Sequence, residues 1–205
     1  MQKILRVFGL LISMLLPGFY VALTSFNLEQ IPLPLLATIS NSRHGLPFPI
    51  QMEAFIMLFL FEIFNEAGRR LPKTVGQTIT VVGGLIIGDS AIRAGITSPT
   101  IIVAVAIATV ATYTLVNQSL TGTVSQFRLY ILFVSSILGM FGFLVSVIGL
   151  VFYLAYLESY GVPYLSPLSP FHSKDIVQAT INRPSGSSNQ RPETFQPRDN
   201  TSKGE

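Results

Sequence analysis

Apolar residues dominate the first three quarters of the chain and fall into long runs separated by short polar or proline-containing stretches. A helix needs about 20 mainly apolar residues to cross the hydrocarbon core of a bilayer. Four runs of roughly that length predict membrane-spanning helices: Ile4 to Phe26, Val75 to Ile92, Thr97 to Val116 and Leu129 to Leu157. The pattern therefore predicts an all-α fold, a polytopic bundle of membrane helices.

Prolines and glycines modify three of these runs. Pro17 lies inside the first run, where the missing backbone donor predicts a kink. The second run contains Gly84 and Gly88, a small-xxx-small spacing that either permits close helix contact or reflects ordinary glycine enrichment in membrane helices. Ser98 followed by Pro99 is typical of a helix start, and it opens the third run.

A shorter apolar segment, Met52 to Phe64, lies between the first two runs. It predicts a broken, tilted or re-entrant fifth membrane segment, and irregular backbone at membrane depth survives only where protein or water covers it. We therefore expect the segment to lie inside an assembly. The candidate hinges or helix breaks on its two sides are Pro47, Pro49, Gly68 and Pro72.

Composition supports a membrane protein. Only 11% of the residues are charged, against about 25% in a soluble globular domain. Residues 1–165 are expected to form the transmembrane helical domain, whereas residues 166–205 read as a polar, disordered tail. Lys3 and Arg6 precede the first run as in a signal peptide, but that run is longer than an ordinary signal segment, and we interpret it as a retained span.

The residue inventory excludes several kinds of chemistry. The chain has no cysteine and two isolated histidines, His44 and His172, so neither a thiolate site nor a metal site is expected. No nucleophile motif, phosphate-binding glycine loop or metalloprotease signature is present. We expect no enzyme activity, no cofactor and no nucleic acid partner, since the basic residues lie at the ends of segments.

Charged residues inside apolar surroundings are the candidate functional groups, because charge at membrane depth is paired, hydrated or functional. On a helix, Glu62 and Glu66 share one face, and Arg69 and Arg70 follow Glu66 at ion-pair spacing. Glu53 points to the opposite face. These spacings predict an ion-pair network around Glu66.

Two interpretations stay open for Glu53 and Glu62, for which we expect no local partner of opposite charge. Either carboxylate lines or gates a hydrophilic path, as acidic rings do in cation channels, or it ties neighbouring helices or subunits together. Asp89 and Arg93 are four positions apart and are expected to form a structural pair. Arg128 and Glu158 are interpreted as markers of membrane boundaries.

Six strings in order resemble one known family, the A subunit of GerA-type spore germinant receptors, over about residues 5–170. Each string alone is a weak signal, but the order and spacing of the six together are specific to this family. The strings are Leu16–Ala22, Pro47–Pro49, Glu62–Lys73, Val82–Gly88, Ala94–Pro99 and Gly161–Pro167.

The resemblance implies a membrane subunit that acts in spore germination, in the inner membrane of the spore. It further implies a complex with a transporter-like B subunit and a lipoprotein C subunit, and oligomerisation of the A subunit into an ion channel. Family members carry a large soluble domain before the first span, which this sequence does not contain, as expected of a fragment, a split gene product or a short paralogue.

Topology follows from the basic residues, which favour the cytoplasmic side. Lys3 and Arg6 place the N-terminus inside. A complete crossing of Met52 to Phe64 gives five spans and puts the basic cluster from Arg69 to Lys73 inside, whereas a re-entrant segment gives four spans and puts that cluster outside. The charge distribution favours five.

Overall fold

The computed structural model describes residues 2–114, 119–159 and 162–163. The chain divides into two compact units, one formed mainly by residues 4–146 and the other by residues 147–205. The elements, in chain order, are α1 (Gln2–Phe26), the short 3-10 helix η1 (Leu28–Gln30), α2 (Leu33–Ser42), α3 (Ile50–Arg70), α4 (Lys73–Arg93), α5 (Pro99–Thr112), α6 (Ser119–Tyr156), β1 (Glu158–Ser159) and β2 (Val162–Pro163).

The prediction of an all-α fold is confirmed for the described residues, apart from the two-residue antiparallel strands β1 and β2. Prolines set several helix starts, because their fixed φ suits the approach to the first turn. Pro32, Pro49 and Pro72 immediately precede α2, α3 and α4, and Pro99 is the first residue of α5.

A break in the segment from Met52 to Phe64 is absent from the structure. The segment from Met52 to Phe64 lies within α3, an uninterrupted helix of 21 residues that also contains Gly68. The broken alternative was therefore wrong, because the apolar residues continue into the charged turns as one helix; the tilted and re-entrant alternatives stay predictions. Pro17 lies inside α1, which is assigned as one helix, and the kink expected there stays a prediction.

The helices differ from the apolar runs in further ways. The third run yields only the 14-residue α5, and α6 begins at Ser119, before the apolar run that predicted it. Gly139 interrupts α6 with φ 62° and ψ −140°, a conformation outside the helical region. The helix α2 was not predicted, since its apolar stretch is too short to indicate a membrane segment.

Within the described residues, two helices are long and apolar enough to cross a membrane: Leu5–Phe26 and Leu120–Tyr156. The length and composition of the described helices thus support two spans and do not confirm the predicted four to five. The predicted polar tail, residues 166–205, lies outside the described residues.

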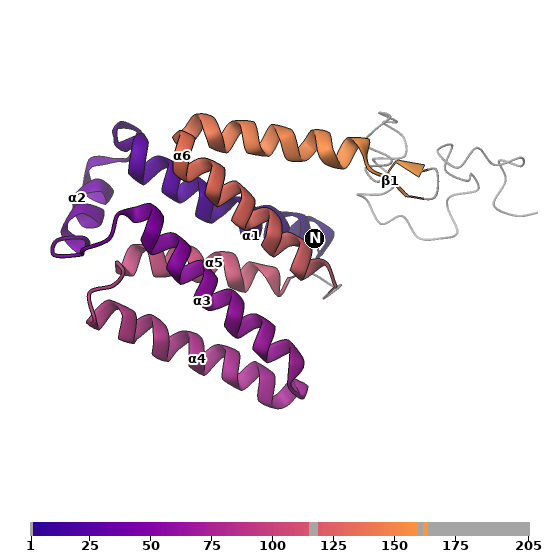
Figure 1. Ribbon diagram of the computed structural model, residues 1–205, viewed down its shortest axis with the longest axis horizontal. Helices are drawn as coiled ribbons and strands as arrows, with labels where there is room; N and C mark the ends of the chain where they lie inside the picture. The colour runs from indigo at the N-terminus through magenta and orange to yellow at the C-terminus, as the bar shows by residue number, and fades with distance from the viewer. Residues whose placement is uncertain (1, 115–118, 160–161, 164–205) are drawn as a thin grey trace, which may run out of the picture. The chain divides into compact units, whose positions relative to one another are not determined.

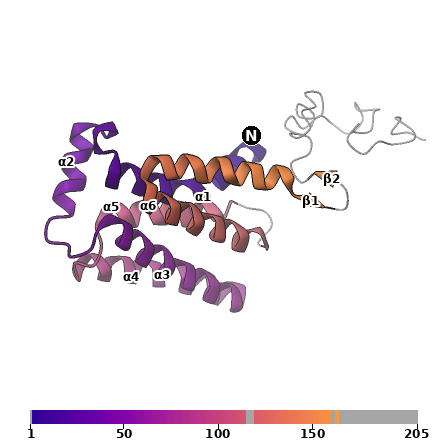
Figure 2. The same cartoon turned by 45° about the horizontal axis from the view of Figure 1, so that its top comes forward.

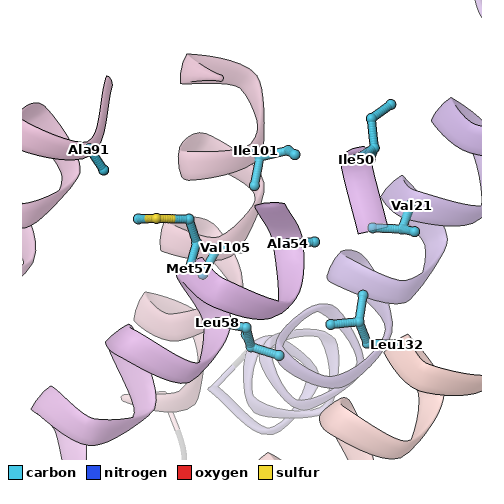
Figure 3. Close-up of a cluster of buried hydrophobic side chains, with 9 residues drawn as sticks. All are labelled: Val21, Ile50, Ala54, Met57, Leu58, Ala91, Ile101, Val105 and Leu132. Atoms are coloured by element: carbon cyan, nitrogen blue, oxygen red, sulfur yellow. The ribbon is translucent and has the colours of Figure 1, made fainter. Parts of the chain in front are cut away.

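The core lies in the larger unit, where α3 packs against α4 and α5, and α2 packs against α5 (Figures 1 and 2). Figure 3 shows the side chains that meet there, contributed by five helices. Met57 and Leu58 of α3 are at most 1% exposed. The cluster comprises Val21, Ile50, Ala54, Met57, Leu58, Ala91, Ile101, Val105 and Leu132.

The backbones of α3 and α4 pack tightly near the turn that joins the two helices. A Cβ added to Gly76 of α4 would overlap the backbone carbonyl oxygen of Gly68 on α3. At Gly88 an added Cβ would meet Ile102 at an ordinary 3.6 Å. Gly76 is therefore tight against the backbone of α3 and Gly83 against the Phe64 ring, 2.9 Å from an added Cβ, whereas Gly88 has ordinary space.

Candidate functional site

Glu53 is a buried carboxylate in the first turn of α3, with no exposed surface. Its Oε1 accepts a hydrogen bond from Arg43 Nη2 at 3.1 Å, and its Oε2 accepts one from the backbone N–H of Ser98 at 3.0 Å. Ser98 is the N-cap of α5, where the partial positive charge of a helix N-terminus favours an anion. Glu53 thus joins α3 to the start of α5.

Arg43, the first residue after α2, closes the connection between α2 and α3 by contacting residues at its far end. Besides the carboxylate of Glu53, its Nη2 contacts the carbonyl oxygen of Phe48 at 3.2 Å. The Arg43 side chain is 25% exposed, so the pair lies at the edge of the fold rather than in its centre. A buried carboxylate is tolerated here because a cation and a backbone donor each bind one of its oxygens.

Helical spacing missed this pair because Arg43 lies outside α3. The signal available in the sequence was the polar stretch around His44, which supplies a basic residue ten positions before Glu53. The contact with Ser98 had no signal, since it joins residues 45 positions apart.

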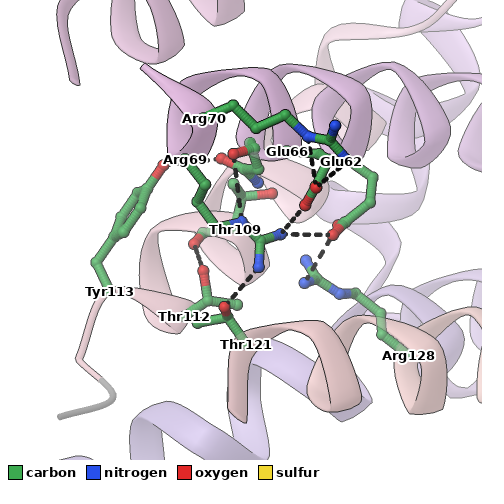
Figure 4. Close-up of polar contacts among 10 residues, drawn as sticks. Glu62, Glu66, Arg69, Arg70, Thr109, Thr112, Tyr113, Thr121 and Arg128 are labelled. Carbon is green, nitrogen blue, oxygen red and sulfur yellow. Dashed lines mark hydrogen bonds and ion pairs between the residues drawn. The ribbon is translucent and has the colours of Figure 1, made fainter. Parts of the chain in front are cut away.

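Glu62 lies at the other end of the site, where the charged turns of α3 face α6 (Figure 4). Its Oε1 accepts a hydrogen bond from Arg69 Nη2 at 3.3 Å, and its Oε2 is 3.8 Å from Arg128 Nη2. Arg69 Nη1 also donates to Thr121 Oγ1 at 2.7 Å. The carboxylate of Glu62 is 22% exposed, in contrast to that of Glu53.

The predicted network around Glu66 is found on the more exposed side of the same turns. Glu66 Oε1 is 3.1 Å from Arg70 Nη2, and Glu66 Oε2 is 3.6 Å from Arg69 Nη2. The Arg70 side chain is 79% exposed, so this pair is a surface contact of small energetic weight. Tyr113, just after α5, donates from its hydroxyl to Asn65 Oδ1 at 2.8 Å and links α5 to the same face.

Arg128 is the residue that sequence reasoning misplaced. It was interpreted as a boundary marker, but it lies inside α6 with a side chain only 2% exposed. Its Nε and Nη1 have no hydrogen-bond partner among the described residues. The sequence contains no sign of this burial, because the apolar run begins just after Arg128 and the arginine was therefore placed at the end of a membrane helix.

The remaining predicted pair is local. Arg93 Nε donates to Asp89 Oδ2 at 2.8 Å, and both side chains are more than half exposed at the end of α4. The structure therefore separates the charged residues into three groups. Glu53 binds Arg43 and Ser98; Asp89 binds Arg93; and the third group contains Glu62, Glu66, Arg69, Arg70 and Arg128.

Taken chemically, these groups hold charge but present no placed nucleophile and base. In each, a guanidinium neutralises a carboxylate. The group around Glu53 joins α3 to the start of α5, the group around Glu62 joins α3 to α6, and the pair of Asp89 and Arg93 stays within α4. The fold and the site define an all-helical protein, associated with a membrane through its apolar helices, whose charged residues link helices to one another.

Comparison with known proteins gives the family. Residues 1–194 match the family model described as Bacillus/Clostridium GerA spore germination protein. The chain is 46% identical to spore germination protein XA of Bacillus anthracis over 97% of its own length and 40% of that protein. It is 37% identical to spore germination protein KA of Bacillus subtilis (strain 168), over 98% of its own length and 37% of that relative.

A third relative, the uncharacterized membrane protein YfkQ of Bacillus subtilis (strain 168), is 36% identical over 98% of the chain and 39% of its own length. The chain thus spans about two fifths of the length of these relatives. No solved structure matches it. This chain belongs to the GerA family of spore germination proteins.

Proposed function

We propose that this chain supplies the membrane helices of an A-type subunit of a nutrient-germinant receptor and acts in spore germination. In this proposal residues 1–165 form the membrane domain and residues 166–205 a polar tail. The subunit works in the inner membrane of the spore with a transporter-like B subunit and a lipoprotein C subunit. It forms or gates an ion-conducting homo-oligomer, without a cofactor and without nucleic acid.

The observation that carries the conduction part of the proposal is the charged face of α3 within an otherwise apolar bundle. Ionisable groups inside membrane proteins line ion paths or form relays between helices. Glu62 is the stronger pore or gating candidate, because its carboxylate is partly exposed and contacts two guanidinium groups. Glu53 is fully buried, so its role in gating would be to hold α5 rather than to line a path.

One observation favours a second function, that of a non-conducting structural partner within such a receptor. Both Glu53 and Glu62 are bound by arginines, and ion-paired carboxylates also serve to hold helices together. In that case the charged face of α3 fixes subunit architecture, and ions cross elsewhere in the receptor.

The experiment that distinguishes the two functions measures release of monovalent cations from spores or cells that produce this chain, alone and with candidate B and C subunits. A Glu62→Gln variant at equal abundance tests the carboxylate. Glu66→Gln, on the same face but 52% exposed, is the matched control.

Release that falls in Glu62→Gln and persists in Glu66→Gln supports conduction or gating through Glu62. Equal release by all three chains at equal abundance contradicts that role and supports the structural function.

A further inference from the structure

The carboxylate of Glu62 lies between two guanidinium groups that it does not bind equally. Arg69 Nη2 is within hydrogen-bond distance of one oxygen, at 3.3 Å, whereas Arg128 Nη2 stands 3.8 Å from the other. Figure 4 shows a contact from Glu62 to each arginine, one on its own helix and one on α6. The present arrangement therefore favours Arg69.

Arg128 is incompletely paired: its Nη2 faces Glu62 at 3.8 Å, and a closer, bidentate approach would let one of the two other nitrogens share the same carboxylate. Its side chain is 2% exposed, and its Nε and Nη1 each expose less than 1 Å² without a hydrogen-bond partner among the described residues. With so little accessible surface, these two nitrogens leave no room for a water molecule against them. A buried guanidinium in this condition is unfavourable unless a neighbouring acceptor moves toward it.

Arg69 has other acceptors available. Its Nη1 donates to Thr121 at 2.7 Å, its Nε donates to the carbonyl oxygen of Asn65 at 3.3 Å, and Glu66 lies 3.6 Å from its Nη2. Arg69 would therefore keep a counter-charge after losing Glu62. For Arg128, Glu62 is the one carboxylate within 4 Å in the part of the chain that the structure describes.

The two contacts on α6 belong to the same helical segment, residues 119–138. Thr121 and Arg128 lie before Gly139, where the helical backbone is interrupted. A shift of residues 119–138 along α3 would change both contacts together, and the interruption at Gly139 separates this segment from the residues that follow.

We propose that Glu62 is a counter-ion exchanged between Arg69 and Arg128, which gives α3 and residues 119–138 of α6 two arrangements. In one, described here, Arg69 holds Glu62 and Thr121. In the other, Arg128 binds Glu62 directly, Arg69 turns to Glu66, and the two helix segments lie closer together at Arg128. A gating role for this exchange rests on the proposed function, whereas the exchange itself requires only this chain.

Because the chain has no cysteine, spin labels attach only at cysteines that are introduced, and the distance between two labels can be measured. Labels at Ile63→Cys on α3 and Tyr130→Cys on α6 occupy side chains that are 48% and 50% exposed. We expect two distance populations in the full chain in lipid. Arg69→Gln, which removes the competing guanidinium, should shift their ratio about tenfold toward the shorter distance, as expected for a hydrogen bond to a charged group.

Arg93→Gln is the matched control, because Arg93 also pairs with a carboxylate, Asp89 on its own helix α4, but contacts neither Glu62 nor Glu66. It should leave the ratio unchanged. A single distance population that Arg69→Gln does not alter, or an equal shift in the Arg93→Gln control, would overturn the exchange. The measurement involves neither ion flux nor partner subunits, so its failure is distinguishable from failure of the proposed function.

Discussion

The carboxylate of Glu53 accepts a hydrogen bond from the backbone N–H of Ser98 at 3.0 Å, which fixes the first turn of α3 against the N-terminus of α5. No side-chain hydrogen bond from Ser98 caps α5. The negative charge that a helix N-terminus favours is thus supplied from another helix. This relationship explains why a fully buried carboxylate is stable in an apolar bundle.

Replacing Glu53 with Gln should destabilise the fold by roughly 2 kcal/mol, because hydrogen bonds to a charged group are lost while the Arg43 guanidinium keeps its charge. The measurement is unfolding of the purified chain in detergent, followed by circular dichroism. Glu66→Gln, a substitution on the exposed side of α3, should change stability by less than about 0.5 kcal/mol. Equal losses in both variants would contradict the role assigned to Glu53.

Arg43 and Glu53 should show energetic coupling in a double-mutant cycle. Arg43→Gln alone leaves the buried carboxylate without its cation, whereas the double variant removes both charges. We expect the double variant to be more stable than the sum of the single losses by about 1–2 kcal/mol. Additive losses in the same unfolding measurement would show that the 3.1 Å contact carries no net interaction.

Gly76→Ala should disturb the hairpin of α3 and α4, because the new methyl group would overlap the backbone carbonyl of Gly68, which cannot rotate away. Overpacking against backbone predicts a loss of about 2–3 kcal/mol. Gly88→Ala is the matched control on the same helix, where the new methyl group meets only Ile102 at 3.6 Å. Stability and yield of both variants in detergent test this difference.

Gly139→Ala should combine two unfavourable effects. The residue has φ 62°, and an added Cβ would lie 2.7 Å from Cγ of Phe26. Left-handed backbone costs an L-residue about 1–2 kcal/mol and overpacking adds a similar amount, so we expect a loss of roughly 3 kcal/mol. Gly45→Ala isolates the backbone effect, since Gly45 has φ 86° and no atom within 4 Å of its added Cβ.

For the Gly45→Ala variant we expect a loss of about 1 kcal/mol. The comparison is made by thermal unfolding of both variants beside the parent chain. If the two glycine variants lose equal stability, packing of Phe26 against the interruption of α6 is not a determinant of the fold.

Local pattern was sufficient to predict most helices. Apolar runs indicated α1, α4, α5 and α6, and spacing along α3 indicated which carboxylates and arginines share a face. The pattern failed where a neighbouring element decides the outcome. It predicted a break within α3, although the helix continues to Arg70, and it gave no sign of the interruption at Gly139, which is one of several glycines in α6.

The sequence by itself determined the class: a low share of charged residues, long apolar helices and an ordered set of family strings are read without coordinates. Only the tertiary structure decided how charge is compensated. The contacts of Glu53 with Ser98 and of Arg69 with Thr121 join residues 45 and 52 positions apart. Helix formation depends on neighbours within a few turns, whereas these contacts depend on how whole helices pack, because buried charge requires a partner wherever the fold places one.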